Sequence, residues 1–417
     1  MKGDFLRVVT AQKGARDHYL IPRSLYRNGA LAQCITDWHS EETLHQLFEG
    51  ISHPLLRRVA DAYVPEVPAQ HISDQKMLGL VRKAAEKIGH MFERRHEAYA
   101  WTDALFARWV ASLDLPPHTA FIGYSYASLE ALEAEQARGV FTVVHQIDPG
   151  RWEWRLVQRE AEKWPAYARP RSEEPDRYFR RAEQEWDLAD LVVVNSEWSR
   201  QALKDQGVDL RKVEVLSLGY DTPSAGSESG RTSEIIEDQN PLTIVWIGST
   251  SIRKGIQYFV EAARELQNTP FQFIVAGSID IRREAVQAAP ENIEWKGHIP
   301  HSEVPSLLRA ADLHVLPTLS DGFGMTQIEA LAHGTPVIAT RNCGHVIDDG
   351  KTGLLIEPRS VEDLVDALLR LNDDRSLLAQ MRSECVKAAS RYSIDAYGKN
   401  LTALLRNRMP QVPDGPK

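Results

Sequence analysis

The chain has 417 residues, of which 43% are apolar and 26% are charged, and its formal net charge is −9. This length exceeds the usual size of a single hydrophobic core, so we expect a globular protein of two domains. The negative net charge argues against general binding to nucleic acid.

The amino-terminal segment and the cysteines indicate a cytoplasmic protein. No apolar run approaches the ~20 residues that cross a bilayer, and residues 1–7 lack the hydrophobic region of a signal peptide. The three cysteines have no metal-ligand spacing, which fits a reducing compartment. The cytoplasm is therefore the expected location, and peripheral attachment to the inner face of the membrane stays open.

Short apolar strands alternate with helical segments through the amino-terminal half, and residues 40–115 are mostly helical in pattern. Strands are predicted at 6–10, 120–124, 140–144 and 191–195. Such alternation is typical of parallel βα units. Residues 222–233 are polar and rich in Gly and Ser, which predicts a flexible linker.

The same alternation restarts after the linker. Strands are predicted at 243–247, 271–276, 293–296, 313–316 and 336–339. We therefore expect an α/β protein with two doubly wound, Rossmann-like domains, residues 1–222 and 223–392, followed by a helix from Ser393. Two such domains that face a central cleft would hold ligands at the carboxyl ends of their strands.

The most informative segment begins at Ser320. Asp321 and Glu329 lie eight positions apart, and a Gly-Phe-Gly loop follows the first acid, while the second belongs to an apolar, helix-like run. Backbone N–H groups at a helix amino terminus favour phosphate, and the helix dipole adds to this. A carboxylate one turn into that helix could accept hydrogen bonds from a ribose diol. The plain alternative is a loop and helix start that carry ordinary acids.

This segment resembles the donor site of the retaining nucleotide-sugar glycosyltransferases of family 4, which have the GT-B fold and carry Glu-x7-Glu with Gly-Phe-Gly after the first acid. Asp321 replaces the first Glu and is one methylene shorter. The resemblance implies that Asp321 serves the donor sugar and Glu329 the ribose. It also implies that helix 393–417 crosses back onto the first domain. The implied contacts of the donor diphosphate and nucleotide are Gly322, Phe323, Gly324, Met325 and Thr326.

Residues 248–255 resemble the Gly-Arg…Lys-Gly loop of that family. Lys254 would place a compact charge on the donor diphosphate, with Gly248 and Ser249 in the same loop. Ser249 stands where the family usually has an arginine, and Arg253 is a candidate to supply the missing charge. The alternative is that Arg253 and Lys254 form a solvated turn.

Candidate residues of the first domain follow two of its predicted strands. His145 ends one strand; such a histidine is more often structural, whereas the resemblance implies that it faces the donor sugar. Asp148 is a spare candidate for a general base. Gly14 occupies the first strand-to-helix turn, where a glycine lets the backbone approach a ligand. A structural turn and a contact with acceptor or phosphate are both open there, with Arg16 as its neighbour.

The resemblance implies a retaining enzyme that moves a sugar from a nucleotide-diphosphate sugar to a hydroxyl of a glycan, lipid-linked glycan or small acceptor, as in polysaccharide biosynthesis. An Asp-x-Asp triplet at a strand end is missing, so we expect a metal-independent reaction with the nucleotide sugar as co-substrate and no bound cofactor. Two alternatives stay open. One is a sugar-nucleotide epimerase of the GT-B fold, and the other is a non-catalytic nucleotide-sugar-binding relative.

Basic and aromatic residues are expected on the acceptor side. They include the pairs Arg57-Arg58, Arg82-Lys83 and Arg94-Arg95, and the aromatic residues Trp152, Trp154, Trp164 and Tyr167. Such residues can mark attachment to an anionic lipid surface. The alternative is a solvated helical face with aromatic packing, and Trp152 and Trp154 could also stack on a sugar ring.

Overall fold

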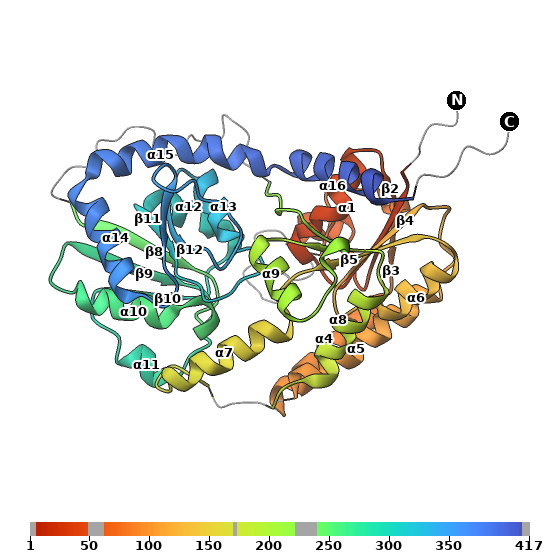
Figure 1. Ribbon diagram of the computed structural model, residues 1–417, viewed down its shortest axis with the longest axis horizontal. Coiled ribbons are helices and arrows are strands. Elements are labelled where there is room, and N and C mark those ends of the chain that lie inside the picture. Colours follow the sequence, from red (N-terminus) through yellow and green to blue (C-terminus); the bar gives the residue numbers. More distant parts are fainter. Residues whose placement is uncertain (1–5, 49–61, 93, 170–172, 222–239, 411–417) are drawn as a thin grey trace.

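Two α/β units make up the molecule in the computed structural model, which describes residues 6–48, 62–92, 94–169, 173–221 and 240–410. Figure 1 shows one sheet in each half, with helices on both faces, and a pair of helices that runs along one side of both halves. The predicted boundary at 222/223, the pair Arg57-Arg58 and residues 411–417 of the expected final helix lie outside the described residues.

The first sheet is parallel, with its strands in the order β3-β2-β1-β4-β5-β6-β7. Its strands are β1 (Val8–Gln12), β2 (Leu31–Thr36), β3 (Ile72–Asp74), β4 (Ala120–Tyr124), β5 (Phe141–Gln146), β6 (Leu191–Val194) and β7 (Val213–Val215). The winding direction reverses between β1 and β4, and ligands of open α/β sheets bind at such a switch point.

The second sheet repeats this plan, in the order β10-β9-β8-β11-β12-β13, and all its pairs are parallel. Its strands are β8 (Leu242–Ile247), β9 (Phe271–Ala276), β10 (Ile293–Gly297), β11 (Leu313–Leu316), β12 (Val337–Thr340) and β13 (Gly353–Ile356). Here the switch point lies between β8 and β11.

Helices cover both sheets. Those before the domain crossing are α1 (Leu20–Arg27), α2 (Glu42–Phe48), α4 (Lys76–Met91), α5 (Arg95–Ala111), α6 (Leu129–Ala137), α7 (Arg151–Lys163), α8 (Asp176–Leu188) and α9 (Glu197–Asp205). Those after it are α10 (Ile256–Glu265), α11 (Arg283–Gln287), α12 (Val304–Ala310), α13 (Thr326–Ala332), α14 (Val361–Asp373), α15 (Arg375–Ala389) and α16 (Ile394–Arg408). None of the described helices is long and apolar enough to span a membrane.

The central strands are buried on both faces, as helices on both sides of a parallel sheet require. Trp246 of β8, for example, is 1% exposed and packs edge-on against Phe259 of α10. Each fully buried side chain of this size contributes about 1.5–3 kcal/mol to folding. The layered packing therefore fixes the strand ends and the loops that follow them.

The last helix, α16, returns to the first unit and packs on α1 (Figure 1). Its Asp395 forms an ion pair with Arg27 at 3.0 Å, and Arg408 forms one with Glu214 at 2.8 Å. A Cβ at Gly398 would overlap the Asn28 side chain, so only glycine permits this close approach. The final helix thus ties the end of the chain to the first sheet.

The strands predicted from apolar runs are present, three of them with the expected bounds, at 120–124, 271–276 and 313–316. Four strands were not predicted: β2, β3, β7 and β13. The expectation that residues 40–115 are mostly helical agrees with α2, α4 and α5, but it did not include β3, which has three residues at the edge of the sheet. β7 is as short, and both are too brief to produce a period in the sequence.

Candidate functional site

The loop after β8 is packed against the segment that follows β11. The Ser251 side chain accepts a hydrogen bond from the Lys254 N–H and caps the short 3-10 helix η4 (Ile252–Lys254). Gly255 has φ +82°, and a Cβ there would overlap the Pro317 carbonyl. The tight turn therefore holds Arg253 and Lys254 against the β11 side of the switch point.

Asp321 lies between the two cations of that loop. Lys254 forms an ion pair with it, and the Arg253 Nη1 is 3.7 Å from its Oδ1 and donates to the Ser320 carbonyl at 3.0 Å. Burial acts to raise the pKa of Asp321, but the charges of Lys254 and Arg253 outweigh it and lower the pKa to about 2. These three residues form a partly buried ionised cluster rather than a solvated turn.

The Gly-Phe-Gly loop leads from this cluster into α13. Asp321 Oδ1 accepts from the Phe323 N–H at 3.4 Å, and the Phe323 ring is buried in the core. Gly324 has φ +79°, a conformation that favours glycine. Met325 and Thr326 begin the helix, and the Thr326 hydroxyl lies 3.1 Å from the His314 Nε2.

Glu329 lies one turn into α13, as the sequence predicts. Its side chain is half-buried, and none of the described residues donates a hydrogen bond to it. Burial raises the pKa of its carboxyl, against the opposing effects of His301 and Lys254. The carboxylate is thus available to a ligand at the same edge of the sheet as Lys254.

The first domain contacts this edge directly. A Cβ at Gly322 would overlap the Ile147 carbonyl, so the loop after β5 lies against the Gly-Phe-Gly loop. Trp198 of α9 donates to the Ser320 hydroxyl at 2.9 Å, and that hydroxyl donates to Glu153 of α7 at 2.6 Å. The two domains therefore meet at the predicted donor site.

Glu153 is a site residue that the sequence reasoning missed. Its Oε2 is 3.7 Å from the Arg253 Nη1. Burial raises its pKa to about 7, assisted by the charges of Asp148 and Asp321 and opposed by Arg253. The sequence shows Glu153 only as an acid in the first turn of the helix that follows the His145 strand. Its partners Ser320 and Arg253 belong to the other domain, so no local pattern identifies it.

His145 lies at the end of β5, 1% exposed and edge-on to Tyr124, with ring centroids 4.9 Å apart. Neither ring nitrogen has a hydrogen-bond partner among the described residues. Burial, with the charge of Arg16, lowers its pKa to about 4, so the imidazole is neutral at pH 7. Asn195, at the end of β6, also has a buried, unpartnered Oδ1.

Gly14 and Arg16 differ in their surroundings. Gly14 has φ +65°, and its N–H donates to Asp37 Oδ1 at 2.7 Å, which fits the structural turn. Arg82 donates to the other Asp37 oxygen at 2.5 Å. Arg16 is exposed and forms no ion pair with any described residue, while its charge influences His145 and Asp103.

Gly248 and Ser249 occupy the start of the β8 loop. Gly248 has φ +126° and donates its N–H to the Ala276 carbonyl at 2.9 Å, and Ser249 is half-buried. The structure thus groups Lys254, Arg253, Asp321 and Glu329 with this loop, and places His145 and Arg16 in the opposite domain. Among the residues that the structure describes, no cluster of His, Cys, Asp or Glu is arranged to hold a metal ion.

Two Rossmann-like domains with their switch points facing one another define the GT-B class, and solved structures agree. HepE from Anabaena, solved with UDP, superposes with a TM-score of 0.61 over 96% of this chain and 100% of that one, at 16% identity. Sucrose-phosphate synthase from Thermosynechococcus elongatus gives a TM-score of 0.58 over 96% and 98%, at 17% identity. At such identities the likeness establishes the fold alone.

Residues 241–374 match the family model described as glycosyl transferases group 1, so the chain contains a domain of that family. Alpha-D-kanosaminyltransferase of Streptomyces kanamyceticus is 27% identical over 40% of this chain and 46% of its own length. D-inositol 3-phosphate glycosyltransferase of Corynebacterium glutamicum is 29% identical over 52% of this chain and 57% of its own. The chain thus spans about half the length of the curated relatives it matches.

Proposed function

We propose that this protein is a retaining glycosyltransferase of family 4 that transfers a sugar from a nucleotide-diphosphate sugar. The observation that carries the proposal is the cluster of Lys254, Arg253 and Asp321 at the switch point of the second sheet. Glu329 lies on the helix that follows the same loop. The UDP in the similar HepE structure and the names of the relatives support this assignment.

Cleavage of the donor depends on stabilising the leaving diphosphate. Lys254 and Arg253 would meet its developing charge, as preorganised oxyanion sites do, and with two cations present the reaction needs no metal ion. Asp321 accepts hydrogen bonds from the sugar hydroxyls, and Glu329 accepts them from the ribose. Each hydrogen bond to such a charged group contributes about 1.5–3 kcal/mol.

Retention follows if the acceptor approaches the face from which the diphosphate leaves. The departing phosphate then takes the acceptor's proton, and no protein nucleophile is required. His145 is neutral and would donate or accept a single hydrogen bond at the sugar. Arg16 lies on the acceptor side of the same cleft.

The acceptor is a glycan, a lipid-linked glycan or a small acceptor, held by the first domain. Contact with a membrane is supported by α4 and the start of α5, which expose several large apolar side chains between basic residues. They are Met77, Leu80, Ile88, Met91, Phe92 and Trp101. Co-sedimentation with anionic vesicles but not with neutral ones would support contact with a membrane. The absence of co-sedimentation with either kind of vesicle would rule this contact out.

The test of the function is a donor screen with product analysis. UDP, GDP, ADP and dTDP sugars are incubated with a pool of glycan, lipid-linked and polyol acceptors, with and without EDTA. Nucleoside diphosphate should appear in step with a new glycoside of retained anomeric configuration, at a rate that EDTA does not change. An inverted product or a rate abolished by EDTA would contradict those parts of the proposal.

A sugar-nucleotide epimerase is the second candidate, because Glu153, with its pKa of about 7, lies where a base beside the sugar ring would be needed. An isomeric nucleotide sugar without a new glycoside would identify it. Donor binding without turnover on any acceptor would instead indicate the non-catalytic relative, which the changes at Asp321 and Ser249 would explain.

A further inference from the structure

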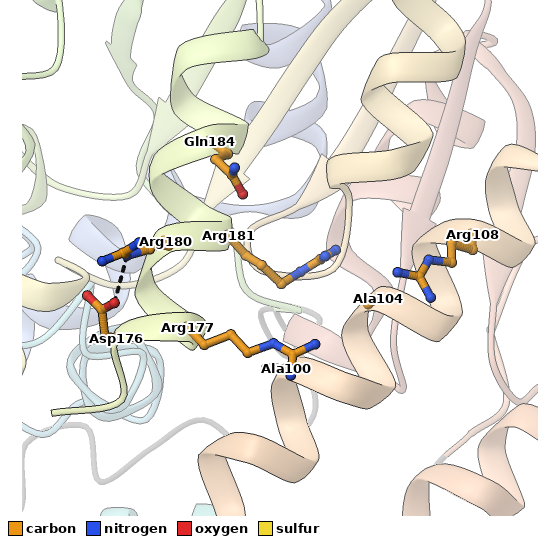
Figure 2. Close-up of a pocket in the computed structure, with 8 residues that line it drawn as sticks. All are labelled: Ala100, Ala104, Arg108, Asp176, Arg177, Arg180, Arg181 and Gln184. Carbon is orange, nitrogen blue, oxygen red and sulfur yellow. Dashed lines mark ion pairs between the residues drawn. The ribbon is translucent and has the colours of Figure 1, made fainter. Parts of the chain in front are cut away.

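A cavity of about 340 Å³ lies between α5 and α8, away from the cluster around Asp321. In Figure 2, Arg177 and Arg181 extend from α8 toward α5, and Arg108 extends from α5 toward α8. Ala100 and Ala104 of α5 leave room below the guanidinium groups (Figure 2). These three guanidinium groups point into one concave surface, which Arg180 and Asp176 also line.

The charges of this pocket are not balanced by its carboxylates. Arg181 donates to Glu130 at 2.7 and 3.2 Å, and Arg108 lies 3.3 Å from the same Glu130. Arg177 forms no ion pair with any described residue. Glu130 therefore pairs with two of the three guanidinium groups and leaves Arg177 without a carboxylate, and the excess positive charge favours an anion that carries more than one negative charge.

The pocket also lies near the cleft. Because α5 and α8 each precede a parallel strand, their amino-terminal halves point to the edge of the sheet where the strands end. The Arg181 Nε donates to the Tyr126 carbonyl at 2.9 Å, and the Tyr126 hydroxyl donates to Asp148 at 2.7 Å. Tyr126 is further held by Tyr178 of α8, with rings stacked at 4.1 Å.

We propose that this pocket between α5 and α8 is a binding site for a phosphate group, separate from the donor diphosphate site. Guanidinium groups match phosphate oxygens with paired hydrogen bonds, and the first turn of α8 adds a favourable dipole. The volume accommodates a phosphate together with a small group that carries it. A bound phosphate contacts Arg181 and thereby stabilises Tyr126, the residue that holds Asp148 at the cleft.

The test is isothermal calorimetry with inorganic phosphate and pyrophosphate at low ionic strength, on the full chain. Arg108→Gln/Arg177→Gln should weaken the binding of pyrophosphate at least about tenfold, because the loss of even one charge-assisted hydrogen bond has an effect of this size. Arg180→Gln is the matched control, because Arg180 is on the same helix and turns away to pair with Asp176 at 2.6 Å (Figure 2). It should change the affinity less than about twofold by that same reasoning.

Lys254→Ala separates this site from the donor site. We expect it to remove only one of two pyrophosphate sites and to leave the one that Arg108→Gln/Arg177→Gln removes. Unchanged binding in the double variant, or loss of all binding in Lys254→Ala, would overturn the proposal. The measurement needs no transferase activity, so its outcome is independent of the proposed function.

Glucose 6-phosphate distinguishes the sources of the phosphate. If it binds more tightly than inorganic phosphate, and the double variant loses this advantage, the site takes a phosphorylated sugar. If the two bind equally and both are lost in the double variant, the site takes free phosphate. Binding of glucose 6-phosphate that the double variant retains would speak against the pocket.

Discussion

The carboxyl edges of the two sheets differ in how they satisfy buried polar groups. At the second sheet, Thr340 donates to the Thr318 carbonyl at 2.6 Å, and both ring nitrogens of His314 lie 3.1 Å from partners. At the first sheet, several buried side chains keep an atom without a hydrogen-bond partner among the described residues. These are Gln12, Thr36, His145 and Asn195.

This difference indicates two kinds of ligand. A buried polar atom without a partner costs about 1–3 kcal/mol, which a hydroxylated ligand can recover. The first sheet therefore gains most from sugar-like hydroxyl groups. The second sheet leaves Gln257 Oε1 without a partner among the described residues, but it presents Lys254 and Arg253, so it gains most from an anion. Four substitutions test this contrast.

The largest effect is expected for Lys254→Ala, because this substitution removes the positive charge that stabilises the leaving diphosphate. The rate of nucleoside diphosphate release should fall about 10²–10³-fold. Lys296→Ala, an exposed lysine of the same domain paired with Glu294, should leave the rate unchanged. Lys254→Ala/Asp321→Asn should recover thermal stability without recovering the rate; an intact rate in Lys254→Ala would place the diphosphate elsewhere.

Glu329→Ala tests the ribose contact on the same sheet. The loss of two hydrogen bonds to a charged acceptor should weaken binding of the nucleoside diphosphate about a hundredfold. Calorimetry measures this directly, and Glu362→Ala in the first turn of α14 serves as the matched control. An affinity equal to that of the unaltered protein would exclude Glu329 from the donor site.

Glu153→Gln tests the contact between the domains through its pH dependence. A pKa raised from 4.5 to about 7 means that the folded state favours the protonated acid. The contribution of the protonated Glu153 to the unfolding free energy is complete below about pH 4.5 and is lost as the pH rises through 7. At pH 5 the unfolding free energy of Glu153→Gln should equal that of the native protein. At pH 8 it should be higher than that of the native protein by at most about 3 kcal/mol.

Denaturant unfolding at the two pH values measures this difference, with Glu133→Gln on the exposed face of α6 as control. An equal difference at pH 5 and pH 8 would mean that Glu153 is ionised throughout this range.

The smallest effect is expected for His145→Leu on the first sheet. Loss of one neutral hydrogen bond to the sugar should lower the turnover about tenfold without changing nucleoside diphosphate affinity. Because burial lowers the pKa of His145 to about 4, the native protein should lose stability as the pH falls from 6.5 to 4, and the variant should lose less. If His145→Leu instead weakens the affinity for nucleoside diphosphate, His145 contacts the nucleotide rather than the sugar.

The sequence predicts the second domain better than the first. Asp321, Glu329 and Lys254 lie in two segments with distinctive glycines, and the structure brings both segments to one switch point. Glu153 and Trp198 were missed because their partners are more than a hundred residues away. Local patterns carry no information about such contacts, and the three-residue strands at the sheet edges are too short to produce a period.

The return of α16 to the first sheet has a mechanical consequence. The chain crosses between the domains twice, and the crossings are paired where the Tyr220 N–H donates to the Tyr392 carbonyl at 2.7 Å and Tyr220 bridges to Ser393. Two adjacent connections resist twisting and sliding, and leave bending about their common line as the softest motion. Bending about this line must also part α7 and the residues after it from the second domain, because Tyr167 donates to Glu261 at 2.9 Å and Arg359 donates to Glu160 at 2.9 Å.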